Sequence, residues 1–269
     1  MQTISSLRTE KALPGGERVN ASGRDAVVFL DCGRGHSHVA EMPPTWLSAL
    51  AWTSLATALA CAAWLALQHL RHPQKMAVMN FVWPLNALYL GPFAVWAYHR
   101  FGRPGTKERG SPAGSGAGAD RPGWQATLVA DMHCGAGCTL GDLIAEWTVF
   151  LVGLRIGGQA IWPELILDFV AAYVLGIVFQ YLTIAPMRGQ HGWEGIKAAL
   201  KADTLSLLAF EVGLFGWMLL TRFVFFANEP LRPDQAAYWL MMQVGMVIGY
   251  LTSYPVNGWL LRARLKEAM

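Results

Sequence analysis

Two cysteines, a histidine and an acid lie close together near the middle of the chain. Residues 133–142 read His-Cys-Gly-Ala-Gly-Cys-Thr-Leu-Gly-Asp and run directly into an apolar stretch. Thiolates and imidazoles suit Cu(I) or Zn(II), and a tight glycine turn would bring Cys134 and Cys138 onto one ion, with His133 as a third ligand. The pattern therefore predicts a Cu or Zn site or a reactive thiol pair. The alternative is that both cysteines only pack at a crowded helix start.

Thr139 and Asp142 have the spacing of a capping box, with Thr139 as the N-cap of a helix. This interpretation places Cys138 just before the helix, where the helix dipole favours the thiolate. Asp142 is then a structural cap rather than a metal ligand. Glu146 would follow on the same face of the helix, below the thiols.

Two acids, Glu146 and Glu211, fall within apolar segments, each about 10 Å below the cytoplasmic membrane surface at ~1.5 Å per residue. Acids in lipid are costly, so they normally face a bundle interior or a watery path. We therefore predict that both line an ion or proton path, the alternative being that their carboxyl groups hold helices together. Asp168 is expected to form a structural pair with Arg155 across a short loop.

The composition indicates an integral membrane protein whose main partner is the lipid bilayer. Hydrophobic residues make up 54% of the chain and charged residues 14%, against roughly 25% charged in soluble domains. The net charge of +3 is modest and predicts no nucleic-acid partner. No phosphate-binding glycine loop, catalytic Ser-His-Asp arrangement or cytochrome-type haem motif occurs in the sequence, which argues against an enzyme.

The apolar segments predict an all-α bundle of about six transmembrane helices, over residues 46–70, 76–98, 139–154, 165–187, 204–226 and 238–261. A span needs ~20 apolar residues, so the third segment is short and is a candidate re-entrant half-helix. Six spans place 11 Lys and Arg on one side and 5 on the other, residues 1–41 excluded, whereas a re-entrant third segment gives 8 and 8. The positive-inside rule therefore favours six spans with both termini cytoplasmic.

Composition divides the chain into four parts. Residues 1–41 lack apolar periodicity and are predicted to be a disordered tail or a mis-called start, because Met42 directly precedes the first span. Residues 42–100 form a two-span unit. Residues 101–130 form a flexible Gly-, Pro- and Ser-rich linker, and residues 131–269 form a four-span core domain.

Several long motifs are specific enough to carry a family resemblance. They are His133 to Trp147, Asp168 to Tyr173, Gly176 to Gln180, Ala185 to Gly189, Lys201 to Ser206, Phe210 to Gly213, Ser253 to Asn257 and Lys266 to Met269. Together they resemble a bacterial membrane family catalogued as domain of unknown function number 4396. The resemblance covers roughly residues 130–269 and implies a multi-pass protein of the bacterial inner membrane, with no activity to carry over.

Two classes of function remain open from the sequence. The first is transport or handling of a soft metal cation, in which the thiols form a cytoplasmic entrance and the intramembrane acids line the path. The second is a non-transport membrane module, a thiol redox sensor or an assembly factor, in which the acids are structural.

Overall fold

The structure is a computed structural model that describes residues 44–74, 76–102, 123–188, 192–263 and 265–266. The predicted all-α class is confirmed, since the elements in these residues are helices. The predicted tail, residues 1–41, and most of the predicted linker lie outside the described residues. The helices are α1 (Thr45–Arg71), α2 (Met79–Leu90), α3 (Pro92–Ala97), η1 (Tyr98–Gly102), α4 (Gly123–Val152), α5 (Ile161–Arg188), α6 (Trp193–Leu220), η2 (Thr221–Phe225) and α7 (Ala236–Arg262).

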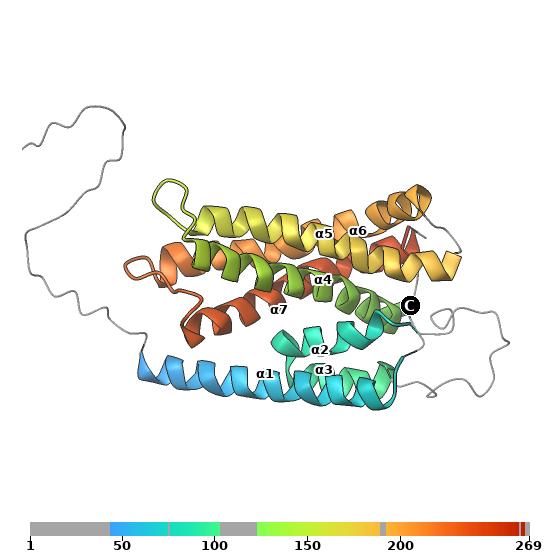
Figure 1. Ribbon diagram of the computed structural model, residues 1–269, viewed down its shortest axis with the longest axis horizontal. Helices are drawn as coiled ribbons and strands as arrows, with labels where there is room; N and C mark the ends of the chain where they lie inside the picture. The colour runs from blue at the N-terminus through green and yellow to red at the C-terminus, as the bar shows by residue number, and fades with distance from the viewer. Residues whose placement is uncertain (1–43, 75, 103–122, 189–191, 264, 267–269) are drawn as a thin grey trace, which may run out of the picture. The chain divides into compact units, whose positions relative to one another are not determined.

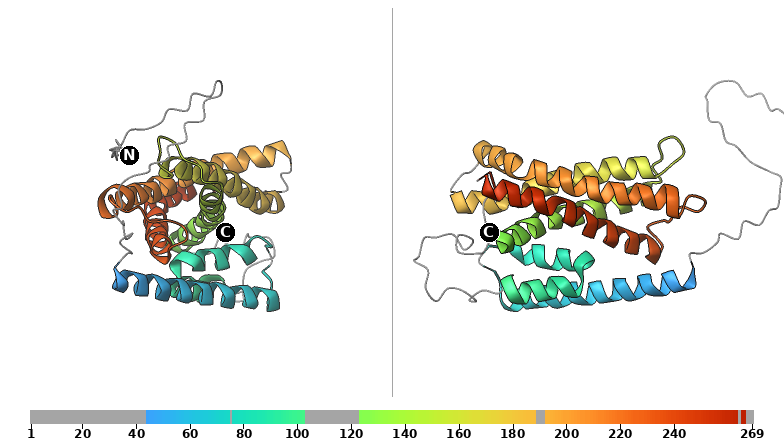
Figure 2. Two further views of the ribbon diagram at one scale, coloured as in Figure 1. Left: turned by 60° about the vertical axis from the view of Figure 1, so that its left-hand side comes forward. Right: turned by 180° about the vertical axis from the view of Figure 1, so that it is seen from behind.

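Four stretches of helix are long and apolar enough to cross a membrane, namely α1, α4, α5 as far as Thr183, and α6 with η2 from Asp203. Large hydrophobic side chains are exposed along their outer faces, such as Leu59 on α1 and Val170 and Val174 on α5. Apolar surface of this extent suits lipid rather than water. The fifth long helix, α7, packs against α6 and α4, as two opposite views show (Figures 1 and 2).

Helix α4 contains the predicted turn and all but the last two residues of the short span predicted to follow it. It is 30 residues long and begins at Gly123, so residues 123–130, assigned to the linker, are helical as well. The prediction failed because the glycines near Cys134 were interpreted as turn residues. The third apolar segment is therefore not a half-helix.

The glycines of α4 allow close packing between helices. A Cβ on Gly137 would lie 2.9 Å from the Cα of Gly176 on α5, and a Cβ on Gly141 would overlap the backbone of Ala172. Each helix therefore presents two small residues four positions apart, which lets the two backbones approach closely. A β-carbon at these positions would force α4 and α5 apart.

The second predicted span, residues 76–98, is not one helix. α2 ends at Leu90, Gly91 has a φ of 52°, and α3 begins at Pro92. Glycine with a positive φ followed by proline at the first helical position suits a change of chain direction. The Nε2 amide of Gln74, before α2, donates to the carbonyl oxygen of Gly102, the last residue of η1, at 2.8 Å. The segment is thus a helical hairpin whose two ends meet (Figure 1).

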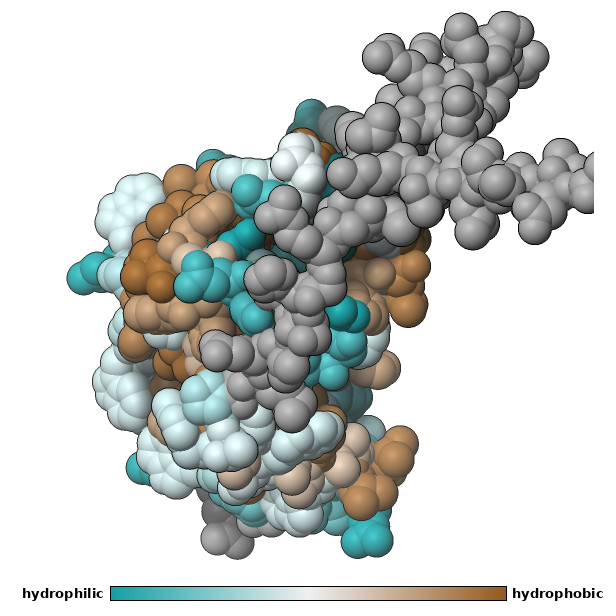
Figure 3. Space-filling model, turned by 90° about the vertical axis from the view of Figure 1, so that its left-hand side faces the viewer, coloured by the Kyte–Doolittle hydropathy of each residue, from teal (hydrophilic) through white to brown (hydrophobic). Residues whose placement is uncertain are grey.

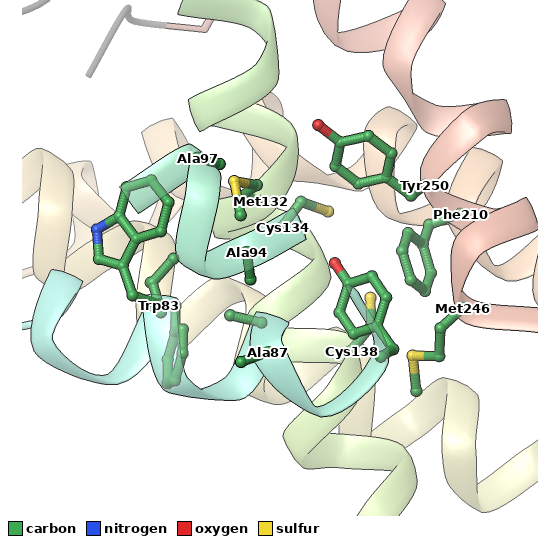
Figure 4. Close-up of a cluster of buried hydrophobic side chains, with 14 of the residues drawn as sticks. Trp83, Ala87, Ala94, Ala97, Met132, Cys134, Cys138, Phe210, Met246 and Tyr250 are labelled. Atoms are coloured by element: carbon green, nitrogen blue, oxygen red, sulfur yellow. The ribbon is translucent and has the colours of Figure 1, made fainter. Parts of the chain in front are cut away.

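The hairpin is joined to α4 by a buried asparagine. Asn86 donates from Nδ2 to the carbonyl oxygens of Val82 and Met132, both at 2.7 Å, and accepts from the Tyr89 hydroxyl at Oδ1. Figure 4 shows Met132, Cys134 and Cys138 on α4 within the core, with Trp83 and Ala87 of α2 nearby. The predicted site residues are therefore in the interior of the bundle.

Candidate functional site

A row of buried polar side chains follows one side of α4, and we call it the buried polar row. Its members are three or four residues apart, so they share a helix face, and they are at most 1% exposed: Asp131, Cys134, Cys138, Asp142 and Glu146. At ~1.5 Å per residue the row extends over about 22 Å. Polar and ionisable groups inside an apolar bundle are costly, so each needs a partner or a function.

A buried ammonium group lies at the end of the row that begins with Asp131. Lys266 donates from Nζ to Asn257 Oδ1 at 2.9 Å, and to Asp203 Oδ1 and Ser206 Oγ, both at 3.3 Å. Its side chain is fully buried, as is nearly all of Asp203, so the pair is shielded from water. We call this part of the row the lysine end.

Asp131 completes the lysine end. One of its oxygens accepts hydrogen bonds from Ser253 Oγ and Asn257 Nδ2, both at 2.5 Å, so Asn257 connects this acid to Lys266. Burial alone lowers the pKa of the Lys266 ammonium, but the nearby anionic groups, Asp203 first, outweigh burial and raise its pKa above the ordinary value. Lys266 therefore stays charged and pairs with the acids around it.

The two thiols lie next to the lysine end. Ser206 donates to the Cys134 sulfur at 3.6 Å, and Cys134 and Cys138 are within hydrogen-bonding reach of each other. The Glu211 carboxyl, from α6, lies within electrostatic range of the Cys138 thiol. The thiols thus lie between the lysine end and the acids further along α4.

His133 does not join the thiols. Its Nε2 is hydrogen-bonded to Thr183 Oγ1 of α5 at 2.8 Å, and its ring lies edge-on to Phe179. Among the described residues, no three His, Cys, Asp or Glu side chains gather closely enough to hold a metal ion. Of the predicted metal ligands, the structure brings together Cys134 and Cys138 and places His133 apart from them.

The other part of the row is a group of four buried acids, which we call the acid region: Asp142, Glu146, Asp168 and Glu211. Each of them is at most 2% exposed. Glu146 lies within electrostatic range of the Asp168 carboxyl and of the Tyr238 hydroxyl. Asp142 lies close enough to Glu211 and Glu146 for their charges to interact.

Most of the acid region lacks hydrogen-bond partners. Both carboxyl oxygens of Asp142 and of Glu211, and one oxygen each of Glu146 and Asp168, are buried without a partner among the described residues. Beyond Glu146, Glu164 lies within electrostatic range of it and of Arg222 near the end of α6. Glu146, near the end of α4, and Glu164, in the first turn of α5, lie toward the end of the bundle that Figure 3 faces. Hydrophilic side chains occur among hydrophobic ones on that face.

Two sequence-based roles and one predicted depth are wrong. Thr139 lies inside α4 and donates to the Gly135 carbonyl oxygen at 2.6 Å, so neither it nor Asp142 caps a helix. Arg155 is exposed, and no ion pair joins it to Asp168 among the described residues, because Asp168 faces Glu146 instead. Glu146 lies six residues before the end of α4 at Val152, far from the end where the helix begins.

Sequence reasoning missed the lysine end. No site role was predicted for Asp131, Asp203, Asn257 or Lys266. One signal was available, because Asp131 interrupts an apolar run just before the cysteines. The contact with Lys266, which lies 135 positions further along the chain, had no local signature.

Comparison with known proteins identifies one matching family. The family described as "Domain of unknown function (DUF4396)" matches residues 123–266, from the first residue of α4 to Lys266. The match contains the whole buried polar row and leaves out α1 and the hairpin. No curated protein matches the chain, and no solved structure does.

Proposed function

The chain belongs to this family of domains of unknown function, and we propose that it carries protons across a membrane along the buried polar row. The observation that carries the proposal is the unbroken spacing of the row. Hydrogen bonds lead from Lys266 through Ser206 to Cys134, and beyond Cys138 the acids lie within electrostatic range of one another as far as Glu146. Buried carboxyl groups inside transmembrane bundles are typical of proton relays.

The acid region supplies the proton-carrying groups. Glu146 and Asp168 lie within electrostatic range of each other, and neighbouring acids avoid carrying two negative charges at once. Gain or loss of one proton there changes the charge that Asp142 and Glu211 experience. A proton can thus pass between acids without leaving a large uncompensated charge in the bundle.

We further propose that five helices cross the membrane, because the α2–α3 hairpin returns to the end from which it started. Residues 1–41 aside, 13 Lys and Arg then lie on the side of residues 103–122 and 3 lie on the opposite side. This asymmetry exceeds that of six spans, and the positive-inside rule makes the side of residues 103–122, together with Lys266, cytoplasmic. The N-terminus would then be outside, whereas the sequence predicted both termini inside.

The five-span and six-span topologies place the loop after α1 on opposite sides of the membrane, and cysteine labelling distinguishes them. His72 is exposed just after α1, and Asn228 is exposed at the opposite end of the bundle. In a background lacking Cys32 and Cys61, a membrane-impermeant maleimide should label Asn228→Cys in intact cells and His72→Cys only after permeabilisation. Labelling of His72→Cys in intact cells would support six crossings instead.

Proton flux tests the main proposal. The protein would be reconstituted into liposomes containing a pH-sensitive dye, and a potassium diffusion potential would be applied with valinomycin. Glu211→Gln should lower the rate of acidification at least about tenfold, as expected when a carrier group becomes unable to ionise. Asp234→Asn is the control, because Asp234 pairs with Arg232 at an exposed loop. Equal flux through wild type, Glu211→Gln and empty liposomes would contradict the proposal.

A soft metal cation, Cu or Zn, remains the second candidate cargo because the two thiols lie together beside Glu211. Elemental analysis of protein purified under reducing conditions, beside a Cys134→Ser/Cys138→Ser variant, tests it. Metal in the wild type alone would favour this cargo. A thiol sensor or assembly factor predicts instead that Glu146→Gln leaves the function intact.

A further inference from the structure

A cavity of about 210 Å³ lies among α1, α2, α4 and α7, beside the acid region. Its walls are mostly aliphatic and thioether side chains, including Leu55, Leu59, Leu88, Leu143, Met242 and Met246. Leu59 is also 59% exposed on the outer face of α1, so the cavity borders the surface that faces lipid. An apolar molecule dissolved in a bilayer could therefore reach it.

All but one of the polar side chains around this cavity form hydrogen bonds with other parts of the protein. Tyr89 donates to Asn86, Thr139 donates to Gly135, and the Trp239 indole donates to the Pro233 carbonyl oxygen. Gln243 accepts from Ser54 and donates to the Leu88 carbonyl oxygen, both at 2.7 Å. These groups shape the wall and leave little polar capacity for a ligand.

Asp142 is the exception. It lines the cavity, its residue is 1% exposed, and neither carboxyl oxygen has a hydrogen-bond partner among the described residues. The Glu146 and Glu211 carboxyls lie within electrostatic range of it. The Lys266 ammonium contacts Asp203, Asn257 and Ser206 at the lysine end instead. The cavity therefore combines an apolar body with an uncompensated acid.

We propose that this cavity binds a lipophilic cation, an amine or ammonium compound whose apolar part fills the cavity and whose charged nitrogen lies against Asp142. An ammonium donor would satisfy both Asp142 oxygens and would neutralise the charge of that carboxylate when it is ionised. The proposal deepens and rests on the proposed function, because Asp142 belongs to the buried polar row. A proton and the cation would bind to Asp142 in alternation, so proton movement would drive exchange of the cation.

The test measures binding of decylammonium and of uncharged decanol to the full chain in lipid nanodiscs, by equilibrium dialysis of radiolabelled ligand against empty nanodiscs. Asp142→Asn should weaken decylammonium binding by about tenfold to a hundredfold, as loss of a charge-assisted hydrogen bond predicts. Decanol binding should change less than about twofold, because the apolar walls remain.

Two tryptophan variants on α1 separate cavity filling from general disturbance. Ala58 is buried and lines the cavity, whereas Ala56 is exposed. Ala58→Trp should abolish binding of both compounds, and Ala56→Trp should bind like the wild type. Melting temperatures of both variants would show that the fold persists.

Three results would overturn the proposal: decanol binding as tightly as decylammonium, unchanged decylammonium binding in Asp142→Asn, or no binding to the wild type. The first would identify a site for lipid chains only. Proton flux without decylammonium binding would refute this inference and leave the proposed function standing. Decylammonium binding without proton flux would refute the proposed function and leave the cation site standing.

Discussion

The lysine end and the acid region are equally buried, yet their polar groups are satisfied to very different degrees. At the lysine end one ammonium group faces Asp203, Asn257 and Ser206 within 3.3 Å, and Asp131 accepts two short hydrogen bonds. In the acid region four carboxyl groups have mainly one another as neighbours, and most of their oxygens lack partners among the described residues.

This difference distinguishes buried polar groups that stabilise the fold from buried polar groups that serve an activity. A paired and hydrogen-bonded charge is costly to break, because loss of one partner leaves the other charge uncompensated. Unpaired acids, by contrast, cost free energy in the resting protein and are retained where they act on a ligand or a proton. We therefore expect changes at the lysine end to alter folding, and changes in the acid region to alter activity.

The largest effect should come from Lys266→Met. Removing the ammonium leaves Asp203 and Asp131 buried without a cation among the described residues, which should lower the free energy of unfolding by about 3–5 kcal/mol. Thermal unfolding in detergent would measure the loss. Lys201→Met, at an exposed position of α6, is the matched control and should melt like the wild type. Equal melting of both variants would remove the structural role assigned to the lysine end.

The pH dependence of that difference provides a second check. Because the pKa of Lys266 is raised in the folded protein, its stabilising contribution is fully present below the unfolded value of about 10.4 and is lost as the pH rises through the folded value. The difference in melting temperature between wild type and Lys266→Met should therefore be constant from neutral pH to about 10, and shrink above it. A difference that shrinks between pH 6 and 8 would identify another group as the cause.

A smaller loss is expected where α4 approaches α5 beside the acid region. Gly141→Ala would place a methyl group against the Ala172 backbone, and overpacking of this kind costs about 1–3 kcal/mol. Gly216→Ala on α6 is the control, since no atom of the described residues lies within 4 Å of its added Cβ. It should be neutral or stabilising. If both variants melt alike, the close α4–α5 contact is not needed.

The smallest effect on stability should come from the acid region itself. Glu211→Gln removes an ionisable group whose two oxygens have no partner among the described residues, so stability should stay within about 1 kcal/mol or rise. Asp203→Asn, the paired acid eight residues earlier on the same helix, should destabilise clearly. Comparing their melting temperatures tests the division directly, and a larger loss in Glu211→Gln would reverse it.

Local sequence patterns identified apolar segments but misjudged their ends. The predicted third span was too short because Gly135 to Gly137 resembles a turn. In the structure Gly137 lies against Gly176, and Gly135 lies against Tyr89. The predicted second span was too long because the Gly91–Pro92 step was passed over within an apolar run. A glycine has the same local preference in both cases, and only its neighbours across the bundle decide its role.

The sequence by itself determined the all-helical class, the apolar surface and the presence of thiols and acids within apolar segments. Hydropathy and residue type are local properties, so they can be seen without the fold. The tertiary structure alone decided that Cys134 and Cys138 lie together without His133, that Asp168 faces Glu146, and that Lys266 lies beside Asp203. These contacts join distant segments, and helix packing rather than sequence spacing sets which of them meet.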